Sequence, residues 1–425
     1  MKKIKFNTIG EEVYYEKLDN GMDVYLFSKD NFHNNYVTFT TKFGSIYNEF
    51  VPIGKDKMIK VPKGVAHFLE HKVFIQEHDP QPSDFFAESG ALTNAYTTFK
   101  NTTYLFTGPD NLIENVKYLL DFVQEPYFTD ENVESEKGII TQEIHMCDDR
   151  PIDVLYEHIR KNTLHNNSFK DSIIGTVNDI NSIDKKVLDT CYNTFYHPSN
   201  MFLVVTGNFN MDEMINAIKE NQSAKDFKKE NEIKIKEYKE SNEVVLKEEI
   251  IKMNTNIPKL AYNIKIPYDK FKIEKRKLNL YLYIIFSILF DDSSVFNEKA
   301  KKDNIITNAV YTNILNCDSH ILISLINETF KYNELLDMIK SELKQINISE
   351  EDLERKKKVL ISNEIFSFEN IEIINEMIID SIIFDNTIEG NIVDIINSLN
   401  INELNEIIKN IDFSNVSTII LKKDK

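Results

Sequence analysis

The segment from Gly64 to His71, with the sequence GVAHFLEH, constrains the fold more than any other part of the chain. Residues four apart on an α-helix lie about one turn apart on the same face, so His67 and His71 present two imidazoles to one point. This arrangement suits two ligands of a tetrahedral zinc ion. A catalytic zinc site needs a third protein ligand, so the fold must bring another polar side chain to this helix.

Glu70 lies three residues after His67 and points in nearly the same direction. A carboxylate beside a metal, but not bound to it, can accept a proton from the metal's water. The alternative is a pair of hydrogen-bonded core histidines beside a surface glutamate. With 9 histidines in 425 residues, this pattern would arise by chance in about one such chain in a hundred, which favours the metal interpretation.

A second helix, expected from Asp130 to about Cys147, carries the candidates for the third ligand. Glu136 and Glu143 are seven residues apart, which is two turns and one face. Three apolar residues give this helix a buried side: Val133, Ile140 and Ile144. One glutamate can complete the metal site, and the other can accept a hydrogen bond from a ligand histidine. The spacing does not decide which glutamate binds the metal and which one supports the histidine.

Length and composition indicate a folded protein of two domains, each of roughly 200 residues. The formal net charge of −18 argues against general binding to nucleic acid. The three cysteines, Cys147, Cys191 and Cys317, form no CxxC pair and indicate a reducing compartment. The start of the chain has no secretory signal pattern, and the longest apolar stretch, 278–290, is too short to span a bilayer. We therefore expect a soluble cytoplasmic protein without a membrane span.

The first half alternates between predicted strands and helices. Strand patterns occur at 22–27, 36–43 and 201–206, and a hairpin is expected from 91–99 and 103–107. Helical spacing predicts helices at about 65–76, 112–123, 130–147, from 152 on, and 187–196.

A charged stretch, Lys225 to Asn242, separates the two halves and is interpreted as a linker, with a solvated helix as the alternative. The expected domains are therefore 1–224 and 243–425. Beyond the linker we expect strands at 259–266, 305–315, 321–326 and 416–421, a helix at 278–290, and a long helix capped by Ser349 with Asp352. This order predicts an α+β fold with mainly antiparallel sheets in two similar domains.

These motifs together resemble the pitrilysin/insulinase metallopeptidases, which carry the inverted zinc motif HxxEH, and especially their processing-peptidase branch. The matching sequences lie within the first 210 residues: 67–71 (HFLEH), 90–97 (GALTNAYT), 136–143 (EKGIITQE), 196–201 (YHPSNM) and 204–208 (VVTGN).

The resemblance implies that Glu143 is the third zinc ligand, with one Zn²⁺ per chain, and that Glu136 is the supporting carboxylate. It also implies that Asn94, Ala95 and Tyr96 lie on a strand beside the zinc site, where an extended peptide substrate can pair by main-chain hydrogen bonds. The family fold has two similar α+β domains per chain, with two chains or two fused halves closing around a chamber.

The second half departs from the family pattern. Active processing-type relatives carry a glycine-rich turn, then an Arg and, seven residues later, a Tyr that stabilise the oxyanion. In this chain the aligned positions are Ala300 and Thr307, Tyr311 is four positions out of register, and the glycine-rich turn is missing. We therefore expect a partner subunit of similar size that lacks HxxEH and supplies Arg and Tyr. A homodimer in which Lys301 or Lys302 replaces the Arg is the alternative.

The expected function is that of a zinc-dependent endopeptidase that hydrolyses extended peptides in an enclosed chamber. Two other interpretations remain: a non-catalytic, peptide-binding or scaffolding subunit of the same family, and a structural metal-binding domain. The presence of both histidines, Glu70 and both helix glutamates favours the enzyme.

Overall fold

The computed structural model describes residues 1–227 and 233–424, and the described chain packs into two compact units. Unit 1 contains Met1–His145, Ser172–Glu237 apart from 228–232, and Ile365–Asn391; unit 2 contains Met146–Asp171, Tyr238–Glu364 and the described residues from Ile392 on. Each unit therefore combines segments from both halves of the chain, whereas the sequence predicted one contiguous segment per domain. The reason is tertiary packing between segments far apart in sequence.

Unit 1 is built on a seven-stranded sheet with the strand order β1-β2-β3-β9-β4-β8-β7. All neighbours pair antiparallel except β3 and β9, which are parallel. The strands are β1 (Lys2–Phe6), β2 (Glu11–Lys17), β3 (Asp23–Ser28), β4 (Asn35–Thr41), β7 (Leu92–Thr97), β8 (Thr102–Gly108) and β9 (Met201–Gly207), with a separate pair β5 (Glu49–Phe50) and β6 (Ile59–Lys60). Because β7 stands at the end of this order, one of its edges is unpaired within the described sheet.

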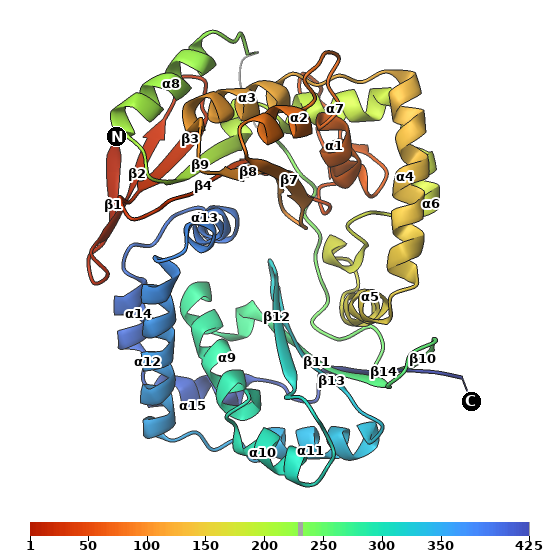
Figure 1. Ribbon diagram of the computed structural model, residues 1–425. Coiled ribbons are helices and arrows are strands. Elements are labelled where there is room, and N and C mark those ends of the chain that lie inside the picture. The colour runs from red at the N-terminus through yellow and green to blue at the C-terminus, as the bar shows by residue number, and fades with distance from the viewer. Residues whose placement is uncertain (228–232, 425) are drawn as a thin grey trace. The chain divides into compact units, whose positions relative to one another are not determined.

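Helices cover both faces of the unit 1 sheet (Figure 1). They are α1 (Val65–Val73), α2 (Pro82–Glu88), α3 (Leu112–Gln124), α4 (Asp130–Asp148), α6 (Val177–Asn181), α7 (Lys185–Phe195), α8 (Met211–Ser223) and α13 (Ile371–Asp380). Strand β9 is buried throughout: Leu203 and Val205 join the core with α1 and α3, while Phe202 and Val204 join a smaller core with α13. This follows from the alternation of side chains along a strand.

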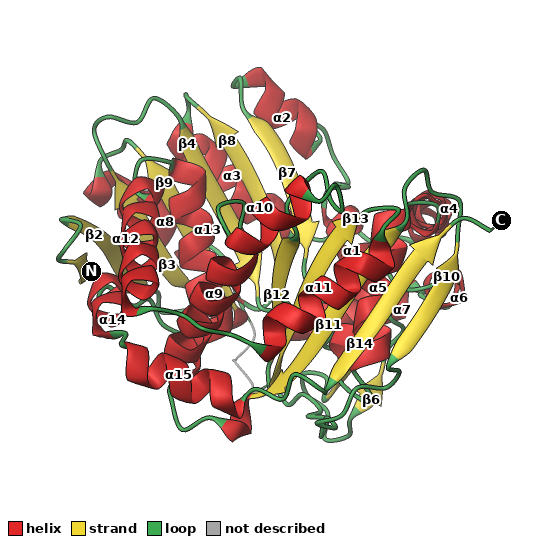
Figure 2. Ribbon diagram, turned by 90° about the horizontal axis from the view of Figure 1, so that it is seen from below, coloured by secondary structure: helices red, strands yellow, loops and turns green. Residues whose placement is uncertain are grey.

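Unit 2 is built on a five-stranded sheet with the order β10-β14-β11-β13-β12 (Figure 2). Only β10 and β14 are parallel. The strands are β10 (Glu248–Lys252), β11 (Lys259–Pro267), β12 (Tyr311–Cys317), β13 (His320–Glu328) and β14 (Val416–Lys422). The helices are α5 (Pro151–Thr163), α9 (Lys275–Phe290), α10 (Val295–Lys302), α11 (Tyr332–Lys344), α12 (Glu350–Ser367), α14 (Ile392–Ser398) and α15 (Ile401–Asn410). α9, α11 and α15 share one core with the sheet, and α5 packs on the other face.

The predicted fold class, α+β with mainly antiparallel sheets in two parts, is confirmed. One predicted strand begins later than expected: 305–315 was expected, but β12 begins at Tyr311. The reason is α10, which ends at Lys302 and is followed by a turn in which Asn304 adopts a positive φ of 53°. A side-chain hydrogen bond also ties this turn back, because the backbone N–H of Val310 donates to Oδ1 of Asn297 at 3.1 Å.

The charged segment 225–242 is anchored where the structure describes it, and residues 228–232 lie outside the described chain. Ile235 forms a bridge with Phe50, and the N–H of Lys236 donates to the carbonyl of Glu49 at 2.9 Å. Further on, Glu240 is buried. The described part of the expected linker is therefore attached to the protein at 235–236 and at Glu240, although residues 234–239 are exposed.

By length and composition alone, one stretch of the described chain, Lys275–Lys302, is apolar enough to cross a membrane. More than half of its most apolar window, 56%, is buried inside the structure, as in a core helix of a folded domain.

Candidate metal centre

The motif helix α1 is positioned by the glycine that precedes it. Gly64 has a positive φ of 80°, and a Cβ at this position would lie 2.4 Å from the carbonyl oxygen of Ile174. Only glycine fits both conditions without strain. The helix then buries its apolar residues in the unit 1 core, among them Phe68 and Leu69. His71 and Glu70 on the other side remain partly exposed.

The second helix, α4, approaches α1 along its own buried face. Val133, Ile140 and Ile144 lie in the core of unit 1, as the sequence predicted. Glu136 lies on the same side and is 5% exposed, whereas Glu143, two turns further on, is partly exposed. The two glutamates therefore reach α1 at different depths.

The structure brings His67, His71 and Glu143 together. Their ligand atoms all lie within 4.8 Å of one another, and Oε2 of Glu143 is 3.6 Å from Nε2 of each histidine. Donor atoms that each lie roughly 2.0–2.2 Å from a tetrahedral zinc ion are roughly 3.3–3.6 Å apart. Two nitrogens and one carboxylate oxygen are also the donor types that zinc binds. The three residues therefore fit a zinc ion in both geometry and chemistry.

Glu136 does not join this group but supports it. Its Oε1 lies 2.9 Å from Nδ1 of His71, which is the contact expected of a carboxylate that orients a ligand histidine. Burial acts to lower the pKa of His71, but the hydrogen bond to Glu136 and the nearby carboxylates outweigh this effect and raise it. With Nδ1 engaged, the ring directs Nε2 toward Glu143.

His67 is held without such a partner. It is 7% exposed, and its Nδ1 is buried with no hydrogen-bond partner among the described residues. Burial, with a smaller effect from the imidazole of His71, lowers the pKa of His67 to about 3. His67 is therefore neutral at physiological pH, which is the form of imidazole that binds metals.

Glu70 lies beside the group and is not one of its three members. The hydroxyl of Thr97 on β7 donates a hydrogen bond of 2.5 Å to Oε2 of Glu70. Burial raises the pKa of Glu70, and the charge of Glu143 adds to this effect, although the bond from Thr97 and the proximity of His71 oppose it. One carboxylate oxygen is thus held in place beside His71 and Glu143.

The three predicted substrate-binding residues lie on the edge strand β7. Asn94 is exposed, and its Oδ1 accepts a hydrogen bond of 2.9 Å from the N–H of Ala95. Ala95 packs against the core that contains α1, whereas the hydroxyl of Tyr96 donates to Oε2 of Glu376 at 2.8 Å. The strand therefore has one face toward α1 and the other toward α13.

The positions aligned with the expected Arg and Tyr lie in unit 2. Ala300 is fully buried in α10. Thr307 and Tyr311, which are both exposed, line a pocket of about 640 Å³ together with Lys301, whose Nζ pairs with Asp292 at 3.1 Å. Neither aligned position offers the guanidinium or the phenol that the family pattern places there.

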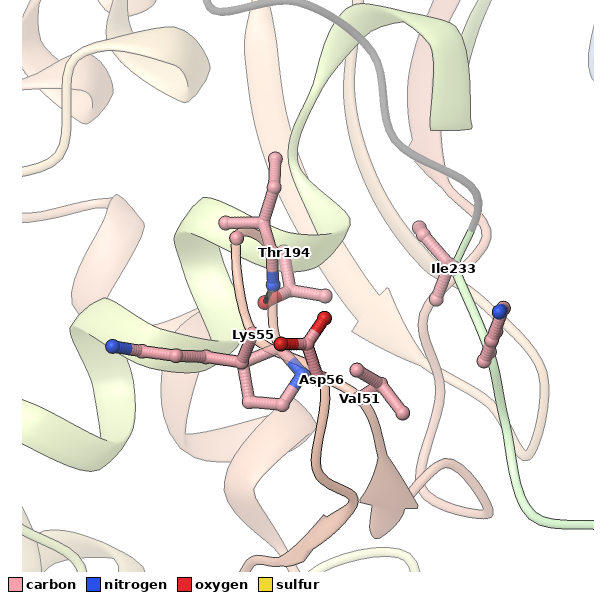
Figure 3. A pocket seen from close by; sticks show the side chains of 9 residues that line it. Val51, Lys55, Asp56, Thr194 and Ile233 are labelled. Atoms are coloured by element: carbon pink, nitrogen blue, oxygen red, sulfur yellow. Dashed lines mark hydrogen bonds between the residues drawn. The ribbon is translucent and has the colours of Figure 1, made fainter.

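A further pocket in unit 1, of about 460 Å³, is lined by Val51, Lys55, Asp56, Thr194 and Ile233 among others (Figure 3). It contains none of the residues of the candidate metal centre, so we assign it no role in that site.

Sequence reasoning assigned no role to three residues: Thr97 and Glu376, which form hydrogen bonds with predicted site residues, and Lys72, which lies next to the motif in sequence. Thr97 directly follows the predicted residues Asn94 to Tyr96, and strand alternation would have placed it toward the motif helix. Lys72 directly follows the motif and is fully buried, with its Nζ donating to the carbonyl of Asn132 at 3.0 Å. Glu376 had no signal, because it lies 280 residues beyond Tyr96.

The fold and the His-His-Glu group define a class of two-part α+β proteins built around the inverted sequence His-x-x-Glu-His. Residues 54–177 match the family described as Insulinase (Peptidase family M16), and residues 182–360 match the Peptidase M16 inactive domain. The chain is 42% identical to the uncharacterized zinc protease YmfH of Bacillus subtilis over 296 residues. The aligned region covers 69% of each protein. This chain therefore belongs to the insulinase family, peptidase family M16.

Other relatives agree with this assignment. The chain is 28% identical over 160 residues to the human mitochondrial-processing peptidase subunit beta, which covers 37% of this chain and 33% of that subunit. Among solved structures, an M16-like protein from Alicyclobacillus acidocaldarius matches with a TM-score of 0.91 and 28% identity over 97% of this chain and 98% of that one. A Helicobacter pylori protease matches with a TM-score of 0.83 and 18% identity over 96% of this chain and 99% of that one. At this identity the match supports the fold alone.

Proposed function

We propose that this chain is a zinc-dependent endopeptidase that hydrolyses extended peptides. The observation that carries the proposal is the convergence of His67 and His71 from α1 with Glu143 from α4, at the spacing of a tetrahedral zinc site. The relatives named zinc proteases support the same conclusion. In this proposal the three residues hold the metal, and Glu136 orients His71.

The chemistry follows from the residues around the metal position. When bound, zinc polarises the peptide carbonyl and makes a water molecule easier to deprotonate. Glu70 would accept the proton of the attacking water and return it to the leaving amine. The raised pKa of Glu70, caused mainly by burial, favours the first of these steps because the carboxylate then takes up a proton more readily. Thr97 would hold the carboxylate so that its other oxygen faces the water.

Substrate binding in this proposal uses the open edge of β7. The strand pairs with β8 on one side only, so its outer N–H and C=O groups can pair with an extended peptide. Thr97, on this same strand, already contacts Glu70. A peptide added beside β7 would therefore lie next to the proposed base, and main-chain pairing would tolerate many side chains.

We also propose a partner for this chain. Ala300 and Thr307 occupy the aligned positions of the Arg and Tyr in unit 2; Ala300 has no side-chain donor for an oxyanion, and Thr307 offers a short hydroxyl in place of the phenol. A homologous subunit that lacks HxxEH would supply them, and the two subunits would enclose the substrate in a chamber. A homodimer that uses Lys301 or Lys302 is the alternative. A cytoplasmic location also remains part of the proposal.

The test is zinc content and peptide hydrolysis of the purified chain, alone and with candidate partner subunits. We expect about one zinc per chain, lost or greatly weakened in Glu143→Gln. Glu70→Gln should retain zinc and lose hydrolysis by roughly 10²- to 10⁴-fold. Glu134→Gln, an exposed glutamate on α4, is the control and should change neither. A chain that holds no zinc after reconstitution would favour the non-catalytic, peptide-binding subunit, and wild-type hydrolysis by Glu70→Gln would refute Glu70 as the base.

A further inference from the structure

Two consecutive residues of β7 bind carboxylates on opposite faces of the unit 1 sheet. Thr97 donates to Glu70 of α1, and Tyr96 donates to Glu376 of α13 at 2.8 Å. Successive side chains of a strand point to opposite faces, so the two hydrogen bonds restrain β7 from both sides. The proposed base and a helix from the far end of the sequence thus meet the same strand.

The helix α13 is fixed firmly on its face of the sheet. Asn375 is fully buried: its Nδ2 donates to the carbonyls of Tyr36 at 3.0 Å and Val204 at 3.2 Å. Its Oδ1 accepts a hydrogen bond of 2.6 Å from the hydroxyl of Thr38. Apolar residues of the same helix, including Ile374 and Ile378, pack in a core with β3 and β9. The position of Glu376 is therefore set by its buried neighbour.

Glu376 connects two strands that are not neighbours. Its Oε1 accepts a hydrogen bond of 3.3 Å from the hydroxyl of Tyr36 on β4, and its Oε2 accepts from Tyr96 on β7. Strand β8 lies between β4 and β7. The carboxylate thus ties the edge strand to the interior of the sheet by a route that is independent of the backbone ladder between β7 and β8.

We propose that Glu376 is a positioning residue that, through Tyr96, holds the edge strand β7 in place to receive a peptide. This inference rests on the proposed function. It concerns what keeps β7 ordered for peptide binding and does not change the chemistry proposed at the metal group. An edge strand that is mobile before binding must become ordered when a peptide pairs with it. The free energy of this ordering weakens peptide binding. The segment 365–391 therefore contributes to substrate binding without a residue at the metal group.

The first experiment measures kcat and KM separately in Glu376→Ala. We expect KM for peptides to rise about 5- to 20-fold, a part of the roughly 10- to 150-fold effect of losing a hydrogen bond to a charged group, with kcat and zinc affinity nearly unchanged. Glu376→Gln keeps an acceptor oxygen for Tyr96 and should restore KM to near the wild-type value. Glu372→Ala, an exposed residue on the same helix, is the matched control and should leave KM unchanged.

A double-mutant cycle then tests the pathway through Tyr96. Tyr96→Phe should raise KM by a similar factor, and the double variant with Glu376→Ala should be no worse than either single variant. Additive effects would overturn the proposal, because Glu376 would then act without Tyr96. A rise in KM confined to peptides with basic residues would also overturn it, since Glu376 would then contact the substrate directly.

Hydrogen exchange separates this inference from the proposed function. Whether or not the chain hydrolyses peptides, Glu376→Ala should speed amide exchange in 92–97 while zinc binding stays at the wild-type level. Faster exchange without any hydrolysis by the wild type, either alone or with candidate partner subunits, would refute the peptidase function but retain the bracing of β7. Unchanged exchange in 92–97 would overturn the positioning role, even in an active enzyme.

Discussion

Nδ1 of His71 lies 2.9 Å from Oε1 of Glu136, a carboxylate that is itself 5% exposed. This contact fixes which nitrogen of the ring is left for a metal and where it points. Burying a carboxylate costs free energy unless the carboxylate has a hydrogen-bonding partner. His71 is that partner for Glu136. The pair therefore couples the packing of α4 on α1 to the geometry of the candidate metal centre.

From this contact we predict that Glu136→Leu lowers zinc affinity by about 10- to 100-fold, the usual effect of losing a group that orients a ligand histidine. The fold should be retained, because leucine suits the buried position. Competition with a chromophoric chelator measures the affinity. Glu134→Leu, exposed on the same helix, is the control. Equal affinities in wild type and Glu136→Leu would contradict the supporting role.

A second prediction concerns the buried pair of Glu240 and Lys265 in unit 2. The side chains lie 2.7 Å apart and are both fully buried. The carboxylate of Glu240 also accepts three backbone hydrogen bonds of 2.7–2.8 Å, from His165, Asn166 and Asn167. Glu240→Gln leaves the ammonium of Lys265 buried without its counter-charge and should cost about 3 kcal/mol of unfolding free energy. Urea unfolding at pH 7 measures this loss, and Glu243→Gln, an exposed neighbour, is the control.

The same pair gives a pH dependence whose sign is fixed. Burial alone would raise the pKa of Glu240, but Lys265 and the three amides outweigh it and lower the pKa to about 2. A carboxylate with a depressed pKa stabilises the fold above its unfolded pKa of about 4.3 and loses this contribution as pH falls toward 2. The difference between wild type and Glu240→Gln should therefore shrink as the pH falls from about 5 toward 2. A constant difference over this range would contradict the assignment.

A third prediction follows from the interleaved units. A fragment 1–242 lacks 365–391, so the face of the sheet with Phe27 and Phe202 loses the apolar side chains of α13. We expect this fragment to aggregate or to bind a hydrophobic dye. Co-expression with 243–425 should restore a soluble complex, because all segments of both units are then present. Size-exclusion chromatography distinguishes the outcomes, and a monomeric, stable 1–242 would show that the first half folds alone.

The sequence predicted the parts of the site whose geometry is local. Four-residue spacing placed His67 beside His71, and seven-residue spacing placed Glu136 and Glu143 on one face of one helix. The structure brings three of these four residues together and pairs the fourth with His71. Which glutamate takes which place depends on how deeply α4 packs against α1, and helical periodicity does not report this depth.

The parts that the sequence did not predict depend on contacts between distant segments. The helix α13 follows a long stretch of unit 2 in the sequence, yet it packs on the unit 1 sheet. Asn375 and the apolar residues beside it make the contacts with that sheet. No local pattern records such a partner. The start of β12 was predicted too early for a local reason. Residues 305–310 include types that favour strands, but they form the turn after α10 instead of extending the strand.

The last prediction concerns Lys72, the fully buried lysine that follows the motif. Burial lowers its pKa, which Glu136 partly counteracts, and its Nζ has a single hydrogen-bond acceptor in the described chain, the carbonyl of Asn132. The aliphatic stem should therefore contribute more to stability than the ammonium group. Lys72→Met keeps the volume and removes the buried charge, so we expect the unfolding free energy to change by less than about 1.5 kcal/mol.

Lys72→Ala removes the stem as well and leaves a cavity in the core between α1 and α4. It should cost about 2–5 kcal/mol, as for other large-to-small changes in a core. Chemical unfolding of both variants beside the wild type gives the comparison, with the exposed lysine variant Lys57→Ala as the control for loss of charge alone. If Lys72→Met costs as much as Lys72→Ala, the ammonium and its bond to Asn132, rather than packing, hold the first turn of α4 against the motif helix.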